Sequence, residues 1–310
     1  MKAQRDVWGQ TLVDLARTDS RVAVVDGDLA TSTKADLFAD AFPDRFFEIG
    51  IAEQNMVGVA FGLSTLGFRP WLSTFGVFLT HRALDPIRML VSQTGAPVKI
   101  AASYSGLLNG SSGKTHQDIE DLAIMRAMPG MTVIAPADAI EAEAAIRWAA
   151  DHDGPVYLRL ARDAVSDIFS PGHAFTPGTV HVLREGNDAL LVSTGVQSSR
   201  VMDAAALLAE EGIEARMVHV PCLKPVDEAA LLSALSGPAP IFTIEEHSII
   251  GGLGGLVSEL VTSTTLGKTV TRLGLADAWS ESAPNSYLLD KYGLSPARVA
   301  GQVRHALADD

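Results

Sequence analysis

The chain has 310 residues, of which 47% are hydrophobic and 20% charged, a composition typical of folded globular domains. A formal net charge of −13 argues against a nucleic-acid-binding protein, because nothing offsets repulsion from the phosphates. The single cysteine, Cys222, excludes an internal disulfide and fits a reducing compartment, so we expect a cytoplasmic protein. No apolar run approaches the roughly 18 residues that would span a bilayer. Residues 1–19 are predicted to form an amphipathic helix rather than a signal peptide.

The first half of the chain alternates short apolar runs with longer helical patterns. The predicted strands are 22–25, 46–49, 69–73, 98–102, 132–135 and 156–159. The predicted helices between them are 34–42, 52–66, 75–93, 117–128 and 138–150. Continuous apolar strands separated by helices indicate an α/β fold with a parallel sheet covered on both faces.

A polar stretch with Pro and Gly follows at 166–188, after which the pattern restarts. The predicted strands of the second half are 189–193, 215–219, 240–244 and 270–273, and its predicted helices are 197–211, 227–235, 251–262 and 296–307. We therefore predict two doubly wound α/β domains, at 1–170 and 189–310, joined by a linker at 171–188 with room for one added strand.

Glu53 stands in the first turn of a predicted helix that follows a buried strand, within Phe47–Met56. The simplest role for it is to complement the helix dipole, worth about a few tenths of a kcal/mol. Its neighbours on both sides are apolar, and burial of that kind raises a carboxyl pKa and lets the group share a proton. The local pattern alone supports both roles about equally.

Two further segments carry residues suited to chemistry. In Ser73–His81, Phe75 and Phe78 are spaced i and i+3, a pattern most often explained by core packing. Ser103–Asp118 is a Gly- and Ser-rich segment that contains Thr-His-Gln, and its His116 could donate a hydrogen bond or shuttle protons.

With these motifs, nearly the whole chain resembles the transketolase family, with a thiamine-diphosphate pyrimidine-binding domain followed by a transketolase C-terminal domain. The resemblance implies that Glu53 activates the cofactor: its carboxyl group bonds the far ring nitrogen of the aminopyrimidine and favours the imino tautomer, whose imine accepts the thiazolium proton. It also implies that Phe78 stacks on the pyrimidine, that Phe75 gives apolar support, and that His81 stands where transketolases usually have a tyrosine.

The same resemblance implies contacts to the substrate and the thiazolium ring. His116 matches the histidine that hydrogen-bonds the donor sugar near its reacting carbonyl. Asp28, after the first strand, matches the acid near the thiazolium. Ser32 and Arg162 match the anchors of the terminal sugar phosphate, and the planar fork of Arg162 suits a tetrahedral anion. Asp28, Ser32 and Arg162 could instead serve as turn residues or surface ion pairs.

The sequence departs from the family pattern at three positions. Tyr104 replaces the phosphate-side histidine, Ser112 replaces the loop acid that contacts a sugar hydroxyl, and Lys114 replaces a proline or alanine. Loss of one cationic anchor and one hydroxyl acceptor puts the usual pentose and hexose phosphates in doubt. A sulfonate or a modified sugar would fit as well.

The family's diphosphate-binding domain, with its Gly-Asp-Gly and downstream asparagine, is missing from the sequence. Asp26-Gly27-Asp28 with Asn55 imitates that spacing, but the order is wrong and Asn55 belongs to the helix of Glu53. We assign no metal ligands. The resemblance therefore implies that a separate N-terminal partner subunit binds Mg²⁺ and the diphosphate, most simply in an α₂β₂ heterotetramer with sites between chains.

We expect a subunit of a two-chain transketolase that transfers a two-carbon ketol unit from an anionic ketose to an aldehyde acceptor. A deoxyxylulose-phosphate-synthase-like enzyme and a 2-oxo acid dehydrogenase β-subunit share both domains, although the Thr-His-Gln segment favours transketolase over the dehydrogenase. A non-catalytic scaffold subunit is a further alternative. The presence of Glu53, Phe78 and His116 together argues against a scaffold.

Overall fold

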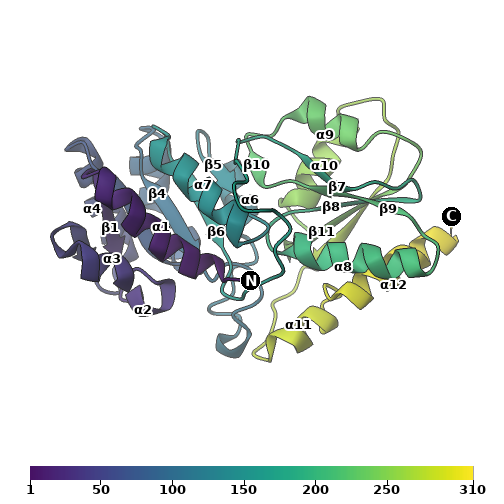
Figure 1. Cartoon of the computed structure of the whole chain (residues 1–310), viewed down its shortest axis with the longest axis horizontal. Coiled ribbons are helices and arrows are strands. Elements are labelled where there is room, and N and C mark those ends of the chain that lie inside the picture. Colours follow the sequence, from purple (N-terminus) through teal and green to yellow (C-terminus); the bar gives the residue numbers. More distant parts are fainter. Residues whose placement is uncertain (310) are drawn as a thin grey trace.

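The computed structural model describes residues 1–309, and the side chains of residues 1–308. Two sheets with helices on both faces lie side by side along the long axis of the molecule (Figure 1). The expected α/β class is thereby confirmed. None of the helices between residues 1 and 309 has both the length and the apolar character that crossing a membrane requires.

The first sheet has seven strands in the order β10-β5-β6-β4-β3-β1-β2, and every pairing except that of β10 is parallel. Its strands are β1 Val22–Asp26, β2 Phe46–Glu48, β3 Arg69–Phe75, β4 Lys99–Ser103, β5 Thr132–Ile134, β6 Val156–Leu160 and β10 Cys222–Lys224. Strands β1, β4, β5 and β6 are buried along their whole length, as the continuous apolar runs predict.

Helices cover both faces of this sheet. They are α1 Gln4–Thr18, α2 Ala30–Thr33, α3 Asp36–Ala41, α4 Glu53–Thr65, α5 Leu84–Pro86, α6 Asp121–Ala127 and α7 Ala139–Asp151. Helices α1, α3 and α7 pack into one apolar cluster, while α4 and α6 pack into another. The helix expected over 75–93 is confirmed in part: Phe75 ends β3, and helical turns then run from 76 to 92 with an interruption at Ala83, as wide π-type turns at Phe78–Arg82 and Ile87–Ser92 on either side of α5.

The second sheet has five strands in the order β12-β11-β8-β9-β7. They are β7 His181–Arg184, β8 Ala189–Ser193, β9 Ala215–His219, β11 Ile241–Ser248 and β12 Val270–Leu275. Its helices are α8 Gln197–Glu210, α9 Glu228–Ala234, α10 Leu253–Thr262, α11 Asn285–Lys291 and α12 Pro296–Asp309, with α8 and α12 on one face and α9 and α10 on the other (Figure 1).

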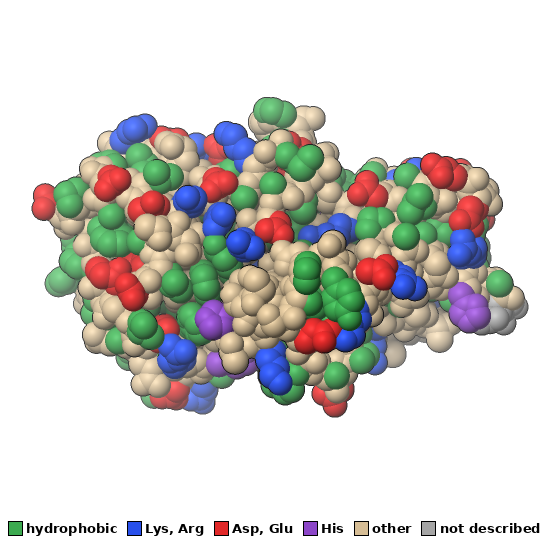
Figure 2. All heavy atoms as spheres, turned by 90° about the horizontal axis from the view of Figure 1, so that it is seen from below, with side chains coloured by type: hydrophobic (Ala, Val, Ile, Leu, Met, Phe, Trp, Pro, Cys, Tyr) green, Lys and Arg blue, Asp and Glu red, His purple; other side chains and the backbone are tan. Residues whose placement is uncertain are grey.

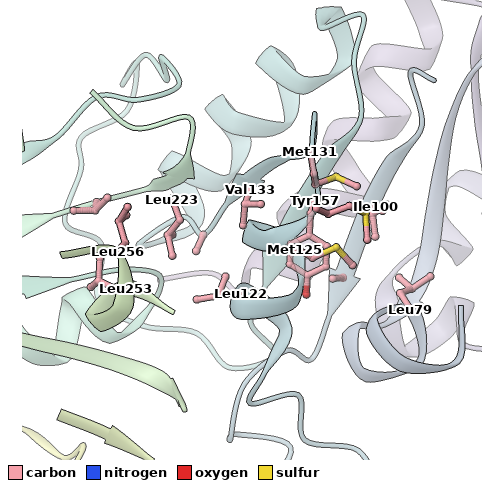
Figure 3. Close-up of a cluster of buried hydrophobic side chains, with 14 of the residues drawn as sticks. Leu79, Ile100, Leu122, Met125, Met131, Val133, Tyr157, Leu223, Leu253 and Leu256 are labelled. Carbon is pink, nitrogen blue, oxygen red and sulfur yellow. The ribbon is translucent and has the colours of Figure 1, made fainter. Parts of the chain in front are cut away.

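The two halves of the chain are joined by more than the linker. Strand β10 comes from the second half but pairs antiparallel with β5 at the edge of the first sheet. An apolar cluster runs across the junction, where Leu223, Leu253 and Leu256 face side chains of the first half such as Leu122 on α6 (Figure 3). Strand β7, from within the predicted linker, pairs antiparallel with β9 in the second sheet.

Acidic and basic side chains are intermingled over the face seen in Figure 2. Neighbouring charges of opposite sign offset part of the mutual repulsion that a net charge of −13 creates.

Candidate active site

Helix α4 begins at Glu53, directly after the loop that follows β2. The Glu53 side chain is 1% exposed, and its Oε1 accepts a hydrogen bond from Arg82 Nη1 at 2.7 Å. Its Oε2 is buried without a hydrogen-bond partner among the residues that the structure describes. A buried carboxylate oxygen with no partner costs free energy, so Oε2 marks a place where a ligand can bond.

Glu53 opens onto a pocket of about 380 Å³, a size suited to a small molecule. The pocket is lined by Gly27, Asp28, Leu29, Ile51, Glu53, Phe78, Arg82, Thr115 and His116. These residues follow strands β1, β2, β3 and β4, whose carboxyl ends meet at one edge of the parallel sheet. Four residues predicted from sequence, Asp28, Glu53, Phe78 and His116, thus line one pocket.

The aromatic residues form a packed row beside this pocket. The rings of Phe78 and His116 meet edge to face with centroids 5.4 Å apart, and Phe75 lies 5.9 Å from Phe78. Phe75 is buried and also stacks on Tyr104 at 4.2 Å. Phe75 therefore supports the row from behind, while Phe78 and His116 reach the pocket.

Two of the predicted site residues have unusual backbone conformations. Asp28 has φ 64° and Tyr104 has φ 59°, in the left-handed region that side-chain-bearing residues rarely adopt. Such conformations cost on the order of 1 kcal/mol or more and are concentrated at functional sites. The carboxylate of Glu48 helps to hold the first of them, since its Oε1 accepts hydrogen bonds from the backbone N–H of Asp28 at 2.9 Å and of Gly50 at 2.7 Å.

Asp26, at the end of β1, lies next to the pocket-lining residues and is fully buried. Its Oδ1 accepts a hydrogen bond from the Leu29 N–H at 2.9 Å, whereas Oδ2 has no partner in the described part of the chain. Burial raises the pKa of Asp26 to about 7.

A cationic cluster surrounds Tyr104. The Arg5 guanidinium donates hydrogen bonds to the Tyr104 hydroxyl and, at 3.0 Å, to the Ser32 carbonyl. The guanidinium carbons of Arg5 and Arg162 lie 5.3 and 5.5 Å from the Tyr104 ring centroid. The structure therefore brings Ser32, Tyr104 and Arg162 together and adds Arg5, which the sequence analysis missed.

Two predicted site residues belong neither to the pocket lining and its aromatic row nor to the Tyr104 cluster. His81 is half-exposed, and its Nε2 lies 3.8 Å from both Asp118 Oδ1 and Glu120 Oε1. Ser112 is exposed in the single turn Gly110–Ser112, and its hydroxyl donates to Asn109 Oδ1 at 3.1 Å. Their predicted roles stay predictions.

Two family models match the chain: "Transketolase, pyrimidine binding domain" over residues 1–167 and "Transketolase, C-terminal domain" over residues 178–299. A putative transketolase C-terminal section from Methanocaldococcus jannaschii is 38% identical over 304 residues, which are 97% of this chain and 95% of that protein. A 6-deoxy-6-sulfo-D-fructose transketolase subunit from a Clostridium species is 35% identical, covering 95% of this chain and 91% of its own.

Solved structures of transketolases are similar to this chain as well. A split-gene transketolase, described as an inactive beta4 tetramer, has 43% identity and a TM-score of 0.91 over 99% of both chains. The transketolase of Campylobacter jejuni shares the fold, with 22% identity and a TM-score of 0.82, over 98% of this chain and 46% of its own. Among relatives compared by sequence, a 1-deoxy-D-xylulose-5-phosphate synthase from Geobacter sulfurreducens is 35% identical over 97% of this chain and 48% of its own length.

Proposed function

Because the chain belongs to the transketolase family, we propose that it is one half of a two-chain transketolase that transfers a two-carbon ketol unit from an anionic ketose to an aldehyde. The observation that carries this proposal is the single pocket that gathers Glu53, Phe78 and His116. A scaffold subunit would have no need to keep a buried, unpartnered carboxylate oxygen in an open pocket, because that oxygen destabilises the fold.

The residues of the pocket fit the aminopyrimidine of thiamine diphosphate. The unpartnered Oε2 of Glu53 would share a proton with a ring nitrogen, and the half-buried Phe78 offers an aromatic face to a planar ring. When bound, thiamine diphosphate supplies a carbon nucleophile for the ketose carbonyl. The chain's own contribution is to hold that ring and to place a proton at Glu53.

His116 is suited to the reacting end of the donor sugar. Its Nδ1 lies 2.9 Å from Thr115 Oγ1, which leaves Nε2 as the nitrogen available to a ligand. A neutral imidazole in this position would donate a hydrogen bond to the carbonyl oxygen as negative charge develops there. Asp28, which also lines the pocket, would face the thiazolium ring.

The cluster of Arg5, Arg162 and Tyr104 would hold the anionic end of the sugar. Two guanidinium groups within 6 Å of one tyrosine ring repel each other, and a shared anion relieves that repulsion. Arg5 also compensates for the histidine that Tyr104 replaces. A relative of similar extent is named for a sulfonated ketose, so a sulfonate is as suitable an anion as a phosphate.

A partner subunit would supply Mg²⁺ and the diphosphate site, in an α₂β₂ assembly with the active site between chains. Two findings support this: both matched domains lie outside the diphosphate-binding part of the family, and a split-gene relative of the same extent is described as an inactive tetramer of one chain type. The exposed Ile51, beside Glu53 in the pocket lining, is an apolar contact that such a partner would cover.

Reconstitution tests the proposal. The chain would be mixed with a diphosphate-domain subunit, Mg²⁺ and thiamine diphosphate, and ketol transfer would be assayed with phosphorylated and sulfonated ketoses. We expect activity from the mixture and none from either chain alone. Ketol transfer by this chain alone would refute the split assembly. Condensation of a pyruvate donor, without ketol transfer, would instead assign the chain to the synthase-like alternative.

A further inference from the structure

A second cluster of polar side chains lies at the junction of the two halves of the chain, away from the pocket of Glu53. Glu141 comes from α7, His173 from the segment between β6 and β7, and His181 from β7. Glu141 Oε1 lies 3.7 Å from His173 Nε2 and 4.0 Å from His181 Nε2. The three ligand atoms all lie within 4.8 Å of one another.

Two of these atoms are buried and unpartnered. The Glu141 side chain is fully buried, and its Oε2 is occupied by the Ala137 N–H at 2.7 Å and by His219 Nε2 at 2.9 Å. Its Oε1 has no hydrogen-bond partner among the described residues, and neither has His173 Nε2. Two buried polar atoms that face each other at 3.7 Å without bonding leave a space that a shared ligand can fill.

The surroundings hold the side chains in place. The His173 ring stacks on Phe169 with centroids 4.0 Å apart, and His181 meets the same ring edge on at 5.1 Å. His219, which orients the carboxylate of Glu141, is itself bonded through Nδ1 to Ser198 Oγ at 2.7 Å. Hydrogen bonds made to the coordinating side chains orient these side chains in metal sites and contribute to the affinity for the metal.

We propose that Glu141, His173 and His181 bind a divalent transition metal ion, with Zn²⁺ the best match. Two imidazoles and one carboxylate form a ligand set that Zn²⁺ uses, with a fourth position open to water. Bonds of about 2.0–2.1 Å in a tetrahedral site separate ligand atoms by about 3.3 Å, so the 3.7 and 4.0 Å distances need to shorten by less than 1 Å. Mg²⁺ and Ca²⁺ are disfavoured because both require oxygen ligands.

The proposed site lies beside a pocket at the surface. His173 also lines a pocket of about 420 Å³, together with Ala139, Glu143, Arg147 and Asp167. Since its ligands come from a helix of the first half, the connecting segment and a strand of the second half, the bound ion would clamp the two halves together.

Metal titration of the untagged chain tests this site. The chain would be stripped with a chelating resin and titrated with Zn²⁺ against a chromophoric competitor, with Co²⁺ as a spectroscopic probe and Mg²⁺ as the negative control. We expect one equivalent of Zn²⁺ to bind with micromolar or tighter affinity, intense visible absorption from tetrahedral Co²⁺, and no competition by Mg²⁺. Thermal unfolding should shift to higher temperature with Zn²⁺.

Variants assign the ion to these residues. Both histidine side chains are partly exposed. His173→Ala and His181→Ala should each weaken Zn²⁺ binding by at least tenfold. The double variant should abolish the Co²⁺ absorption. His152→Ala, which removes a histidine that stacks on Trp148 outside the cluster, should leave both readouts unchanged. Glu141→Gln would be interpreted only if its circular dichroism matches the parent chain. No saturable Zn²⁺ binding below about 100 μM, or unchanged binding in a folded double variant, would overturn the proposal.

Discussion

Arg82 bonds only one oxygen of Glu53: Nη1 lies 2.7 Å from Oε1, and Oε2 remains buried without a partner in the described chain. The two side chains differ sharply in exposure, at 49% for Arg82 and 1% for Glu53. The Arg82 guanidinium also lies 4.6 Å from the centre of the Phe78 ring. A ligand can therefore bond Oε2 while the arginine keeps Oε1, although it must compete with the guanidinium for the face of Phe78.

The first prediction concerns Glu53→Gln. The amide keeps the shape of the side chain but cannot share a proton with the aminopyrimidine, so exchange of the thiazolium proton in the reconstituted complex should fall more than tenfold. That loss is about 1.4 kcal/mol or more, and NMR would measure it. Glu143 is a half-exposed acid paired with Arg147, and Glu143→Gln is therefore the matched control for the loss of one negative charge. Exchange above a tenth of the wild-type rate would contradict the role.

The second prediction concerns Arg82→Met in the chain alone. It leaves a buried carboxylate without its cation, so the free energy of unfolding should fall by about 1–2 kcal/mol, between the values for surface and buried pairs. In a Glu53→Gln background the same change should cost less, because no charge remains to be compensated. Urea unfolding of the four chains gives the coupling energy, and strictly additive effects would show that the ion pair contributes nothing.

Arg162→Ala and His116→Ala should fail in different ways. Arg162 contacts an anion remote from the chemistry, so its loss should chiefly raise KM. His116 faces the reacting end, so kcat should fall as well, by about 10²-fold or more if it stabilises developing charge. Steady-state kinetics of the reconstituted enzyme separates the two. Similar modest changes in both parameters for both variants would reject the assignment.

The fourth prediction is a pH dependence that originates at Asp26. Its pKa in the folded chain is raised to about 7 from an ordinary value of 3.8, so the folded state binds the proton more tightly than the unfolded state. Its contribution to stability is therefore fully present below about pH 4 and is lost as pH rises to about 7. Asp26→Asn keeps an acceptor for the Leu29 N–H but cannot ionise.

Relative to wild type, Asp26→Asn should therefore gain stability as pH rises from 4 to 7, by up to a few kcal/mol. Denaturant unfolding at several pH values would measure this difference. Lys99→Met, which removes a buried charge elsewhere in the same sheet, serves as the comparison variant. The prediction would be contradicted if the difference in free energy of unfolding between wild type and Asp26→Asn stayed constant between pH 4 and 7.

The sequence predicts both ends of every parallel strand to within four residues, because buried strands appear as continuous apolar runs. It fails for β10, a strand of three residues whose partner, β5, lies about ninety positions earlier in the chain. Over 75–93 it predicts the helical turns but misses their interruption at Ala83 and their wide π-type geometry, near Pro86, which removes a backbone donor. That proline was a usable signal.

The site residues likewise differ in whether a local motif or only a long-range contact identifies them. Glu53, Phe78 and His116 stand in local motifs, so they could be named from sequence. Arg5 could not be assigned to the Tyr104 cluster, since Arg5 on α1 and Tyr104 after β4 meet only in the folded chain. Its one local signal is a positive charge in the first turn of a helix, where the helix dipole disfavours a cation. The histidines near Glu141 were missed for the same reason.

The antiparallel pairing of β10 with β5 has a consequence for how the protein is made. The first sheet cannot be completed on the ribosome when residue 160 emerges, because its outermost strand is synthesised only at Cys222–Lys224. Until then β5 is an unprotected edge, open to pairing with another nascent chain. A chain truncated after the first family domain should therefore be prone to aggregate even though its helices and parallel strands are all present. During synthesis, the first sheet is therefore completed only after β10 in the second half of the chain has been made.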